Sequence, residues 1–225
     1  MGLLMIGQTG EDYLKLVYQL SLDHQVVTRS LIAEQFQVSA AAVTKMIKRL
    51  KELKLLASEN GQGLCLTPAG KKVALEVVRH HRLLELYLYE ALDYTWDQVH
   101  EEAERLEHVI SKRFVDKIDA LLGHPTHDPH GAPIPGKNGE IETVRYPSLD
   151  DLEPGQEAII QRVAKDDASM LRYMGELGLY LGTEVKLVSK EPYGGPIYLL
   201  VDGRQCAIGA ELAGNVLVVL KENVP

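Results

Sequence analysis

Cysteine and long apolar runs are what this sequence has least of. Its 225 residues include only two cysteines, Cys65 and Cys206. Two cysteines in a chain of this size do not make a disulfide framework, and they make cysteine-based metal binding improbable, so we expect the reducing cytoplasm. No apolar run approaches the roughly 20 residues of a membrane span, and the N-terminus lacks the basic region and cleavage site of a signal peptide. The sequence therefore argues against a membrane protein and against a disulfide-stabilised secreted one.

Positive charge is also scarce, and it is unevenly placed. The 24 Lys and Arg residues face 32 Asp and Glu residues, which gives a net charge of −8 and argues weakly against nucleic acid as a partner. Residues 1–75, however, carry nine basic and six acidic side chains. Within them, a ten-residue stretch contains Lys45, Lys48, Arg49, Lys51 and Lys54 against a single acidic residue, Glu52. A nucleic-acid partner is therefore expected to bind the N-terminal region.

The N-terminal region has the order of elements of a winged helix-turn-helix. Residues 8–22 have a helical apolar pattern, and the stretch VVTRSLIAEQF predicts a second helix with Thr28 as its N-cap. After a short turn, Ser39 caps a third helix, SAAAVTKMIKRLKEL. Two short apolar runs around the turn Glu-Asn-Gly-Gln-Gly then predict a β-hairpin. Helix, turn, helix and hairpin in this order indicate a DNA-binding domain.

The third predicted helix has one apolar and one basic face. Small residues at its start allow a close approach to a DNA groove, and its basic residues can contact phosphates and base edges. The alternative is a small structural helical bundle with a solvated basic face. The residues that we expect at the DNA are Thr28, Ser39, Ala41, Ala42, Thr44, Lys45, Lys48, Arg49 and Gln62.

Two further helices are predicted, at 68–92 and 96–122, and the second contains HEEAERLEHVISKR. On a helical wheel His100, Glu104, Glu107 and His108 form a stripe roughly 100° wide. The stripe borders an apolar sector of Ala103, Leu106, Ile110 and Phe114. A solvated face with local ion pairs and a metal site both fit this pattern, and a metal site would need ligands from elsewhere in the fold. His81 and Glu85, four residues apart on the preceding helix, share one face.

The C-terminal half begins with a Pro/Gly-rich stretch, GHPTHDPHGAPIPGKNG, which is typical of an ordered loop or linker. Its residues His124, His127 and His130 could bind a metal, but no regular element fixes their geometry. From about residue 153 to residue 222, strand-like segments and one helical segment, separated by Gly and Pro turns, predict a small β-barrel. The fold class is therefore α+β.

The whole chain resembles the metal-dependent repressors of the diphtheria toxin repressor family, which include manganese transport regulators. The motifs that carry the resemblance are EDYLKLVYQL, the helix-turn-helix, LCLTPAGKKVALEVVRHHRLLE, VHEEAERLEHVIS and HPHGAPIPG. The tail LGLYLGTEVKLV…GGPIYLLVDG is similar to the SH3-like domain of ferrous-transport accessory proteins. The resemblance implies a DNA-binding domain at 1–72, a helical dimerisation and metal-binding domain at 73–140, a linker at 141–152 and an SH3-like domain at 153–225.

The resemblance also implies a cytoplasmic homodimer on a near-palindromic operator, activated by a divalent metal. The apolar surplus of RLLELYLYEAL, from Leu83 to Tyr89, fits helix–helix association, although a helix buried within one chain would look the same. One implied metal site uses Asp12, Glu104, Glu107 and His108. The second uses His81, Glu85 and His100, with Asp167 and the poor hard-metal ligand Met170 at the positions where long members supply further ligands.

Three positions of this sequence decide which metal the resemblance implies. Iron-type members have Met at the position of Asp12 and Cys at that of Glu104, whereas both are carboxylates here. Hard oxygen ligands with imidazole suit Mn²⁺, so we expect a manganese-activated regulator of metal-uptake genes, with an Fe²⁺-responsive one as the alternative. Lys15 stands where the short manganese-type members have a Glu ligand, so their paired-metal arrangement cannot be transferred whole.

Two other classes of function compete with this interpretation. Clustered Glu and His residues can hold two metals for hydrolysis, but the sequence offers no nucleophile motif and no Gly-rich phosphate loop, so we do not expect an enzyme. A DNA-binding protein whose acidic face does not respond to metal is the other alternative. Metal-independent operator binding would favour it.

Overall fold

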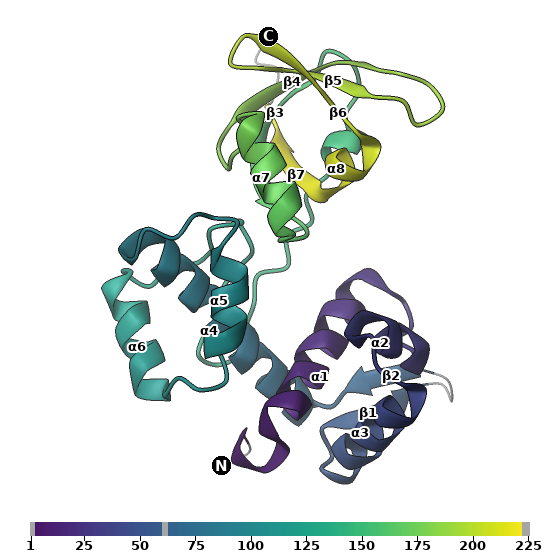
Figure 1. The fold of residues 1–225 in the computed structure, drawn as a ribbon, viewed down its shortest axis with the longest axis vertical. Coiled ribbons are helices and arrows are strands. Elements are labelled where there is room, and N and C mark those ends of the chain that lie inside the picture. The colour runs from purple at the N-terminus through teal and green to yellow at the C-terminus, as the bar shows by residue number, and fades with distance from the viewer. Residues whose placement is uncertain (1–2, 60–62, 222–225) are drawn as a thin grey trace. The chain divides into compact units, whose positions relative to one another are not determined.

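The structure is a computed structural model that describes residues 3–59 and 63–221 and divides the chain into two compact units. The first unit comprises Met1–His81, Arg105–Val115 and Pro135–Ile141. The second comprises Arg82–Glu104, Asp116–Ile134 and Glu142–Pro225. Figure 1 shows the helices and strands of both.

The first unit begins with three helices and a two-stranded hairpin that pack around one apolar core (Figure 1). Its elements are α1 (Leu3–Asp23), α2 (Arg29–Phe36), α3 (Ala40–Glu52), β1 (Leu56–Glu59) and β2 (Gly63–Leu66), with β1 and β2 antiparallel. The side chains of Thr28 and Ser39 accept hydrogen bonds from the backbone N–H groups of Leu31, at 3.2 Å, and Ala42, at 3.3 Å. These contacts confirm both predicted N-caps and fix where α2 and α3 begin.

Helix α4 (Pro68–Ala91) follows the hairpin and contributes to both units. The hydroxyl of Thr67 accepts a hydrogen bond from the N–H of Gly70 at 3.1 Å, and Pro68 occupies the first position of the helix, where its missing N–H costs no hydrogen bond. Leu83, Leu84, Leu86 and Leu88 are buried within the chain itself. The apolar surplus of this helix thus serves mainly its own core, and Tyr89 remains 47% exposed.

The prediction of a single helix at 96–122 is wrong, because the structure has two helices there. They are α5 (Val99–Leu106) and α6 (Lys112–Leu121), with a turn between them. The hydroxyl of Ser111 accepts a hydrogen bond from the N–H of Phe114 at 3.2 Å, which starts a new helix. Glu107 and His108 therefore lie in a turn, where the wheel does not apply, and Phe114 is 45% exposed instead of belonging to an apolar face.

The C-terminal part of the second unit contains η1 (Leu149–Asp151), β3 (Glu157–Val163), α7 (Ala168–Glu176), β4 (Glu184–Lys190), β5 (Ile197–Val201), β6 (Arg204–Ile208), α8 (Ala210–Asn215) and β7 (Val216–Leu220). Its strands form one five-stranded antiparallel sheet with the order β6-β5-β4-β3-β7. This sheet confirms the predicted C-terminal β domain, although the short helix α8 was not predicted. Helices α7 and α8 accompany the strands (Figure 1) and contribute Leu171, Met174, Leu212 and Ala213 to the barrel core.

The histidine-containing loop of the second unit is held in place by close backbone contacts. Gly131 has φ +81°, and a Cβ atom there would lie 2.2 Å from the carbonyl oxygen of Gln161, so only glycine fits. The N–H of Val163 donates to the carbonyl of His130 at 2.9 Å, which ties the loop to β3. Arg82 on α4 donates to the carbonyl of Pro133. The loop therefore has the fixed geometry that its sequence pattern did not predict.

Among the helices of the described residues, none is long and apolar enough to cross a membrane.

Candidate metal centres and DNA-binding face

Helix α1 and the turn after α5 bring three predicted metal ligands together in the first unit. Each of Asp12, Glu107 and His108 offers one ligand atom, and these atoms lie within 4.8 Å of one another. Nε2 of His108 lies 2.7 Å from Oδ1 of Asp12 and 3.2 Å from Oε1 of Glu107. We call this group, with Glu11 and Lys15 from α1 and His81 from α4, the Asp12 centre.

Glu11 is a member of the Asp12 centre that sequence reasoning missed. It is buried, and its carboxylate lies 2.6 Å from Nδ1 of His108. An N–H at Nδ1 that donates to Glu11 turns Nε2 toward Asp12 and Glu107, which is how carboxylates commonly orient metal-binding histidines. Burial lowers the pKa of His108, but its hydrogen bonds with Asp12, Glu107 and Glu11 raise it to about 11. The surrounding carboxylates thus strongly favour a cation at this position.

Glu107 is the most buried carboxylate of the centre, and it is surrounded by nitrogen atoms. Its Oε2 lies 2.8 Å from Nζ of Lys15 and 2.5 Å from Nδ1 of His81. Burial raises the pKa of Glu107, but hydrogen bonds with His108 and His81 and the charges of His81 and Lys15 hold it well below its usual range. Glu107 is therefore an anion at neutral pH and is available as a ligand.

The donor set of the Asp12 centre fits a hard divalent cation. It consists of carboxylate oxygens and an imidazole nitrogen, and oxygen-rich sets of this kind suit Mg²⁺, Ca²⁺ and Mn²⁺ better than they suit soft metals. Among the described residues, the groups able to hold a metal contain His, Asp and Glu but no Cys.

The fourth predicted ligand, Glu104, belongs to the second unit, whereas Asp12, Glu107 and His108 belong to the first. Its side chain is 51% exposed on α5, in the second unit, and its Oε1 lies 3.9 Å from Nε2 of His100, one turn earlier on that helix. Helix α5 ends at Leu106 and Glu107 and His108 lie in the turn that follows, so the four residues do not form the helical stripe that the wheel predicted.

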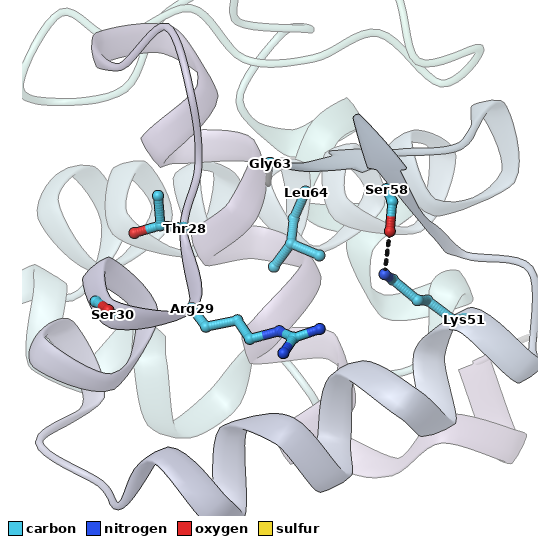
Figure 2. Close-up of a pocket in the computed structure, with 7 residues that line it drawn as sticks. All are labelled: Thr28, Arg29, Ser30, Lys51, Ser58, Gly63 and Leu64. Carbon is cyan, nitrogen blue, oxygen red and sulfur yellow. Dashed lines mark hydrogen bonds between the residues drawn. The ribbon is translucent and has the colours of Figure 1, made fainter. Parts of the chain in front are cut away.

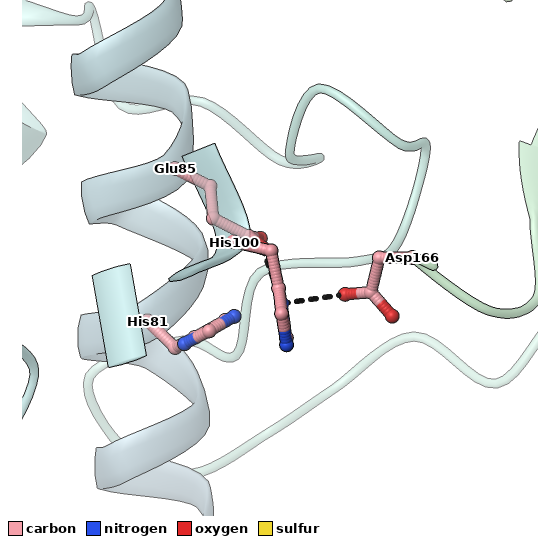
Figure 3. Close-up of side chains that lie close together, drawn as sticks. All are labelled: His81, Glu85, His100 and Asp166. Carbon is pink, nitrogen blue, oxygen red and sulfur yellow. Dashed lines mark hydrogen bonds and ion pairs between the residues drawn. The ribbon is translucent and has the colours of Figure 1, made fainter. Parts of the chain in front are cut away.

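A second cluster lies in the second unit around Glu85, as Figure 3 shows. Nδ1 of His100 lies 3.2 Å from Oε1 of Glu85 and 3.1 Å from Oδ2 of Asp166, and His81 lies one turn before Glu85 on α4. Burial lowers the pKa of His100, but its hydrogen bonds with Asp166 and Glu85 raise it to about 10. We use the name Glu85 centre for this cluster together with Asp128 and His130, whose ligand atoms also lie close to Glu85.

The loop before the barrel adds two buried residues to the Glu85 centre. Ligand atoms of Glu85, Asp128 and His130 lie within 4.8 Å of one another. Nε2 of His130 donates to the carbonyl of Trp96 at 2.7 Å, which leaves the lone pair on Nδ1. That Nδ1 is buried, has no hydrogen-bond partner among the described residues and lies 3.9 Å from Oε1 of Glu85. A bare lone pair that faces a carboxylate is the arrangement that a bound cation would satisfy.

Burial and the charge of Glu85 act together on Asp128. They raise its pKa to about 6, while Arg82, 3.5 Å away, and His130 lower it. The sequence interpretation set this histidine loop aside because it has no periodic pattern. The available signal was Gly131 directly after His130, which marks a backbone held against a neighbour.

The aspartate that joins the Glu85 centre is Asp166, whereas the resemblance implies Asp167. Oδ1 of Asp167 accepts a hydrogen bond from the N–H of Met170 at 2.9 Å and caps α7. The side chain of Met170 packs against the barrel core. Helix capping therefore uses the carboxylate that the resemblance assigned to the metal.

The predicted DNA-contacting face of α3 is exposed. Val43, Ile47 and Leu50 are buried, and the opposite face presents Ala41, Ala42, Thr44, Lys45, Lys48 and Arg49 to solvent. The hydroxyls of Thr28 and Ser39 are engaged as N-caps, so they act first on their own helices. Gln62, also expected at the DNA, lies outside the described residues.

Beside this face is a polar pocket of about 300 Å³ at the start of α2 (Figure 2). Nζ of Lys51 donates to the hydroxyl of Ser58 at 2.5 Å on one side, and the exposed Arg29 and Ser30 lie on the other. A helix N-terminus with two basic side chains suits an anion the size of a phosphate group. The sequence interpretation named Lys51 only as part of the basic stretch, and it did not single out Arg29, Ser30 or Ser58.

Three family models match consecutive parts of the chain. They are the iron dependent repressor N-terminal DNA binding domain over residues 5–64, the iron dependent repressor metal binding and dimerisation domain over residues 67–136, and the FeoA domain over residues 148–220. A solved structure described as a manganese-dependent transcriptional repressor in complex with manganese is 35% identical and covers 94% of this chain and 100% of that one, with a TM-score of 0.87. The chain belongs to the diphtheria toxin repressor family of metal-dependent transcriptional repressors.

Curated relatives of this repressor cover almost its whole length. The iron-dependent repressor IdeR of Mycobacterium leprae is 28% identical in an alignment 222 positions long, which covers 93% of this chain and 96% of the relative. The diphtheria toxin repressor of Corynebacterium efficiens is 29% identical in an alignment 220 positions long, which covers 93% of this chain and 94% of the relative. The family consists of transcriptional repressors, so the hydrolase alternative is rejected. The similar proteins differ in the metal they are named for, iron for IdeR and manganese for the solved structure.

Proposed function

We propose that this repressor is activated by Mn²⁺ and acts in the cytoplasm as a homodimer on a near-palindromic operator of metal-uptake genes. Its domains would be those drawn from the sequence, at 1–72, 73–140 and 153–225 with a linker at 141–152. Asp12, Glu107 and His108 would hold the ion at the Asp12 centre, joined by Glu104. His81, Glu85, His100, Asp128, His130 and Asp166 supply the candidate ligands for a second ion.

The observation that supports the proposal is that the candidate ligand atoms of the Asp12 centre are all carboxylate oxygens or imidazole nitrogens. Asp12 contributes a carboxylate 2.7 Å from His108, at the position where a softer sulfur ligand would favour later or softer metals. Both cysteines lie in strands far from these ligands in the sequence, Cys65 in β2 and Cys206 in β6. Fe²⁺ remains the second candidate, because the curated relatives with 28% and 29% identity are an iron-dependent repressor and a diphtheria toxin repressor.

Activation follows from where the ligands lie in the chain. A bound divalent ion supplies the positive charge that lets these carboxylates and the imidazole of His108 converge. Asp12 belongs to α1, which shares its apolar core with α2 and α3, while Glu107 and His108 belong to the turn after α5. Asp12 would thereby fasten the DNA-binding helices to that turn. An ion that binds better to the DNA-competent arrangement shifts the population toward it.

DNA recognition would combine α3 with the pocket beside it. Lys45, Lys48 and Arg49 face solvent on α3 and can reach base edges and phosphates in a major groove. The pocket between Arg29 and Lys51 would take a backbone phosphate, which fixes the register of the helix without reading sequence.

The direct test is a DNA-binding titration on the upstream region of a manganese-uptake gene, with Mn²⁺, Fe²⁺, Zn²⁺ or a chelator. We expect tight binding with Mn²⁺ and a loss of at least about tenfold in affinity with chelator, which is a typical allosteric coupling. Unchanged binding in chelator would favour a repressor that does not respond to metal. Activation by Fe²⁺ alone would favour the iron-responsive alternative.

A further inference from the structure

Trp96, the only tryptophan of the chain, connects the turn before α5 to the C-terminal barrel. The residue is 8% exposed and belongs to the core cluster of the barrel, although the first barrel strand begins only at Glu157. Its ring centroid lies 5.1 Å from that of Tyr180. The indole therefore fastens a turn of the helical region to the barrel by apolar packing.

The backbone carbonyl of Trp96 faces the Glu85 centre. It accepts a hydrogen bond from Nε2 of His130 at 2.7 Å. Because a carbonyl oxygen can only accept, the ring proton lies on Nε2, and the lone pair of the neutral ring lies on Nδ1. That Nδ1 lies 3.9 Å from Oε1 of Glu85. The carbonyl of Trp96 thus determines which nitrogen of His130 is left for a cation.

Both partners of this hydrogen bond are held against the barrel. Beside Trp96, the carboxylate of Asp97 accepts a hydrogen bond from Nη1 of Arg172 on α7 at 3.0 Å. On the other side, the N–H of Val163 on β3 donates to the carbonyl of His130 at 2.9 Å. The barrel therefore fixes the distance between the carbonyl and the imidazole.

The cost of this arrangement points to a role in metal binding. Nδ1 of His130 is buried and finds no hydrogen-bond partner in the described part of the chain. A buried polar atom without a partner is unfavourable. A divalent ion removes this cost, because it takes up the lone pair and at the same time balances the charge of Glu85.

We propose that Trp96 is a positioning residue of the Glu85 centre. Its indole, packed in the barrel core, holds its carbonyl against Nε2 of His130, and this hydrogen bond directs Nδ1 toward the metal. The inference rests on the proposed function, because it assumes that the Glu85 centre holds a divalent ion. It adds that His130 binds the ion through Nδ1, and that the affinity of the centre depends on the packing of the barrel.

The first experiment determines which ring nitrogen of His130 carries the proton, by NMR of the metal-free full chain with isotope-labelled histidine. His130→Gln identifies the signal. The variants are Trp96→Ala, which removes the indole from the barrel core, and Trp96→Phe, which keeps an aromatic ring there. Tyr193→Ala is the control, because it removes an aromatic side chain that is fully exposed in the turn between β4 and β5.

We expect the proton on Nε2 in wild type, in Trp96→Phe and in Tyr193→Ala. Trp96→Ala should show a mixture of the two tautomers, because the turn no longer holds its carbonyl against the ring.

The second experiment measures Mn²⁺ binding by the electron paramagnetic resonance of the unbound ion, and Glu85→Gln identifies the ion of the Glu85 centre. Trp96→Ala should weaken the binding of this ion about 10- to 100-fold, the usual effect of losing the group behind a metal-binding histidine. Trp96→Phe and Tyr193→Ala should bind it as wild type does. The ion at the Asp12 centre should keep its affinity in all three variants, because Asp12, Glu107 and His108 belong to the first unit.

Two results would overturn the inference: a wild type with the proton on Nδ1, or the same tautomer and the same Mn²⁺ affinity in Trp96→Ala and Trp96→Phe. The proposed function fails differently, because Glu85→Gln would then bind as many Mn²⁺ ions, with the same affinities, as wild type. Circular dichroism identifies a variant that has not folded. If Trp96→Ala does not fold, Trp96→Leu, which keeps an apolar side chain in the barrel core, replaces it with the same expected result.

Discussion

At the scale of single residues, the imidazole of His108 lies between two carboxylates of the Asp12 centre. One ring nitrogen faces Glu11 at 2.6 Å, and the other faces Asp12 at 2.7 Å. Glu11 therefore acts on the metal through the ring, as a positioning residue. Buried carboxylates behind a metal-binding histidine fix its tautomer and orientation.

Glu11→Gln should weaken Mn²⁺ binding at the Asp12 centre by about 10- to 100-fold, because the ring of His108 loses its charged acceptor. Isothermal titration calorimetry with Mn²⁺ measures the change. Glu211→Gln, at an exposed position of α8, is the matched control and should bind as wild type does. Equal affinities for Glu11→Gln and Glu211→Gln would remove Glu11 from the centre.

Some site residues followed from the sequence and others did not, for physical reasons. Asp12, Glu107 and His108 were named from the family resemblance, and the structure brings them together, while their role as metal ligands stays a prediction. Glu11 was missed because the resemblance names ligands and not the groups behind them. His130 was considered and set aside, and Asp128 was missed, because a loop without periodicity gives no direction to its side chains.

At the scale of elements, local signals predicted helix starts better than helix lengths. Thr28 and Ser39 were read correctly because a cap is a contact within three residues. The prediction of one helix at 96–122 was wrong because the N-cap residue Ser111 lies within a stretch whose apolar pattern looks like one continuous helix. The position of the histidine loop against β3 depends on a contact between residues 30 apart, which no local signal contains.

The exposed face of α3 leads to a prediction about salt dependence. Lys45→Ala should weaken DNA binding about fivefold on all sequences and lower the slope of log affinity against log salt by about one, because one phosphate contact is lost. Affinity measured at several salt concentrations tests this, with Lys71→Ala as the control on α4. If affinity and slope both stay at the wild-type values, α3 does not approach DNA with this face.

The close approach of Gly131 to β3 leads to a prediction about stability. Gly131→Ala should lower the free energy of unfolding by about 3 kcal/mol, because the new Cβ would lie 2.2 Å from the carbonyl of Gln161 and the backbone is left-handed. Gly155 also has a positive φ, of +91°, but has nothing within 4 Å of its Cβ position. Gly155→Ala should therefore cost only about 1 kcal/mol. Similar losses for both variants in urea denaturation would contradict the close approach.

At the scale of the whole molecule, the proposed homodimer needs an apolar surface that one chain leaves uncovered. Such side chains occur in the second unit within the region that matches the family's metal-binding and dimerisation domain, at residues 67–136. They are Tyr89, which is 47% exposed, Leu92, 49%, and Leu121, 69%. A contiguous exposed apolar patch commonly marks a contact with another protein, so these side chains are the candidates for the interface.

Leu121→Glu should raise the dimer dissociation constant at least about tenfold, because it places a charge in an apolar contact. Analytical ultracentrifugation over a range of concentrations measures the constant. Leu22→Glu, a change at a residue 53% exposed on α1, should leave it unchanged. A dimer that tolerates Leu121→Glu has its interface elsewhere.

The central claim, that an all-oxygen and nitrogen donor set makes Mn²⁺ the activating metal, is tested most directly by operator affinity across a metal panel. The proteins compared are wild type and Asp12→Met, each with Mn²⁺, Fe²⁺ and Co²⁺. We predict that wild type is activated best by Mn²⁺. In Asp12→Met, activation should move toward Fe²⁺ or Co²⁺ while the operator stays the same, because α3 is untouched. A wild type that binds its operator equally with and without Mn²⁺, or an Asp12→Met variant with an unchanged order of metals, would contradict the account.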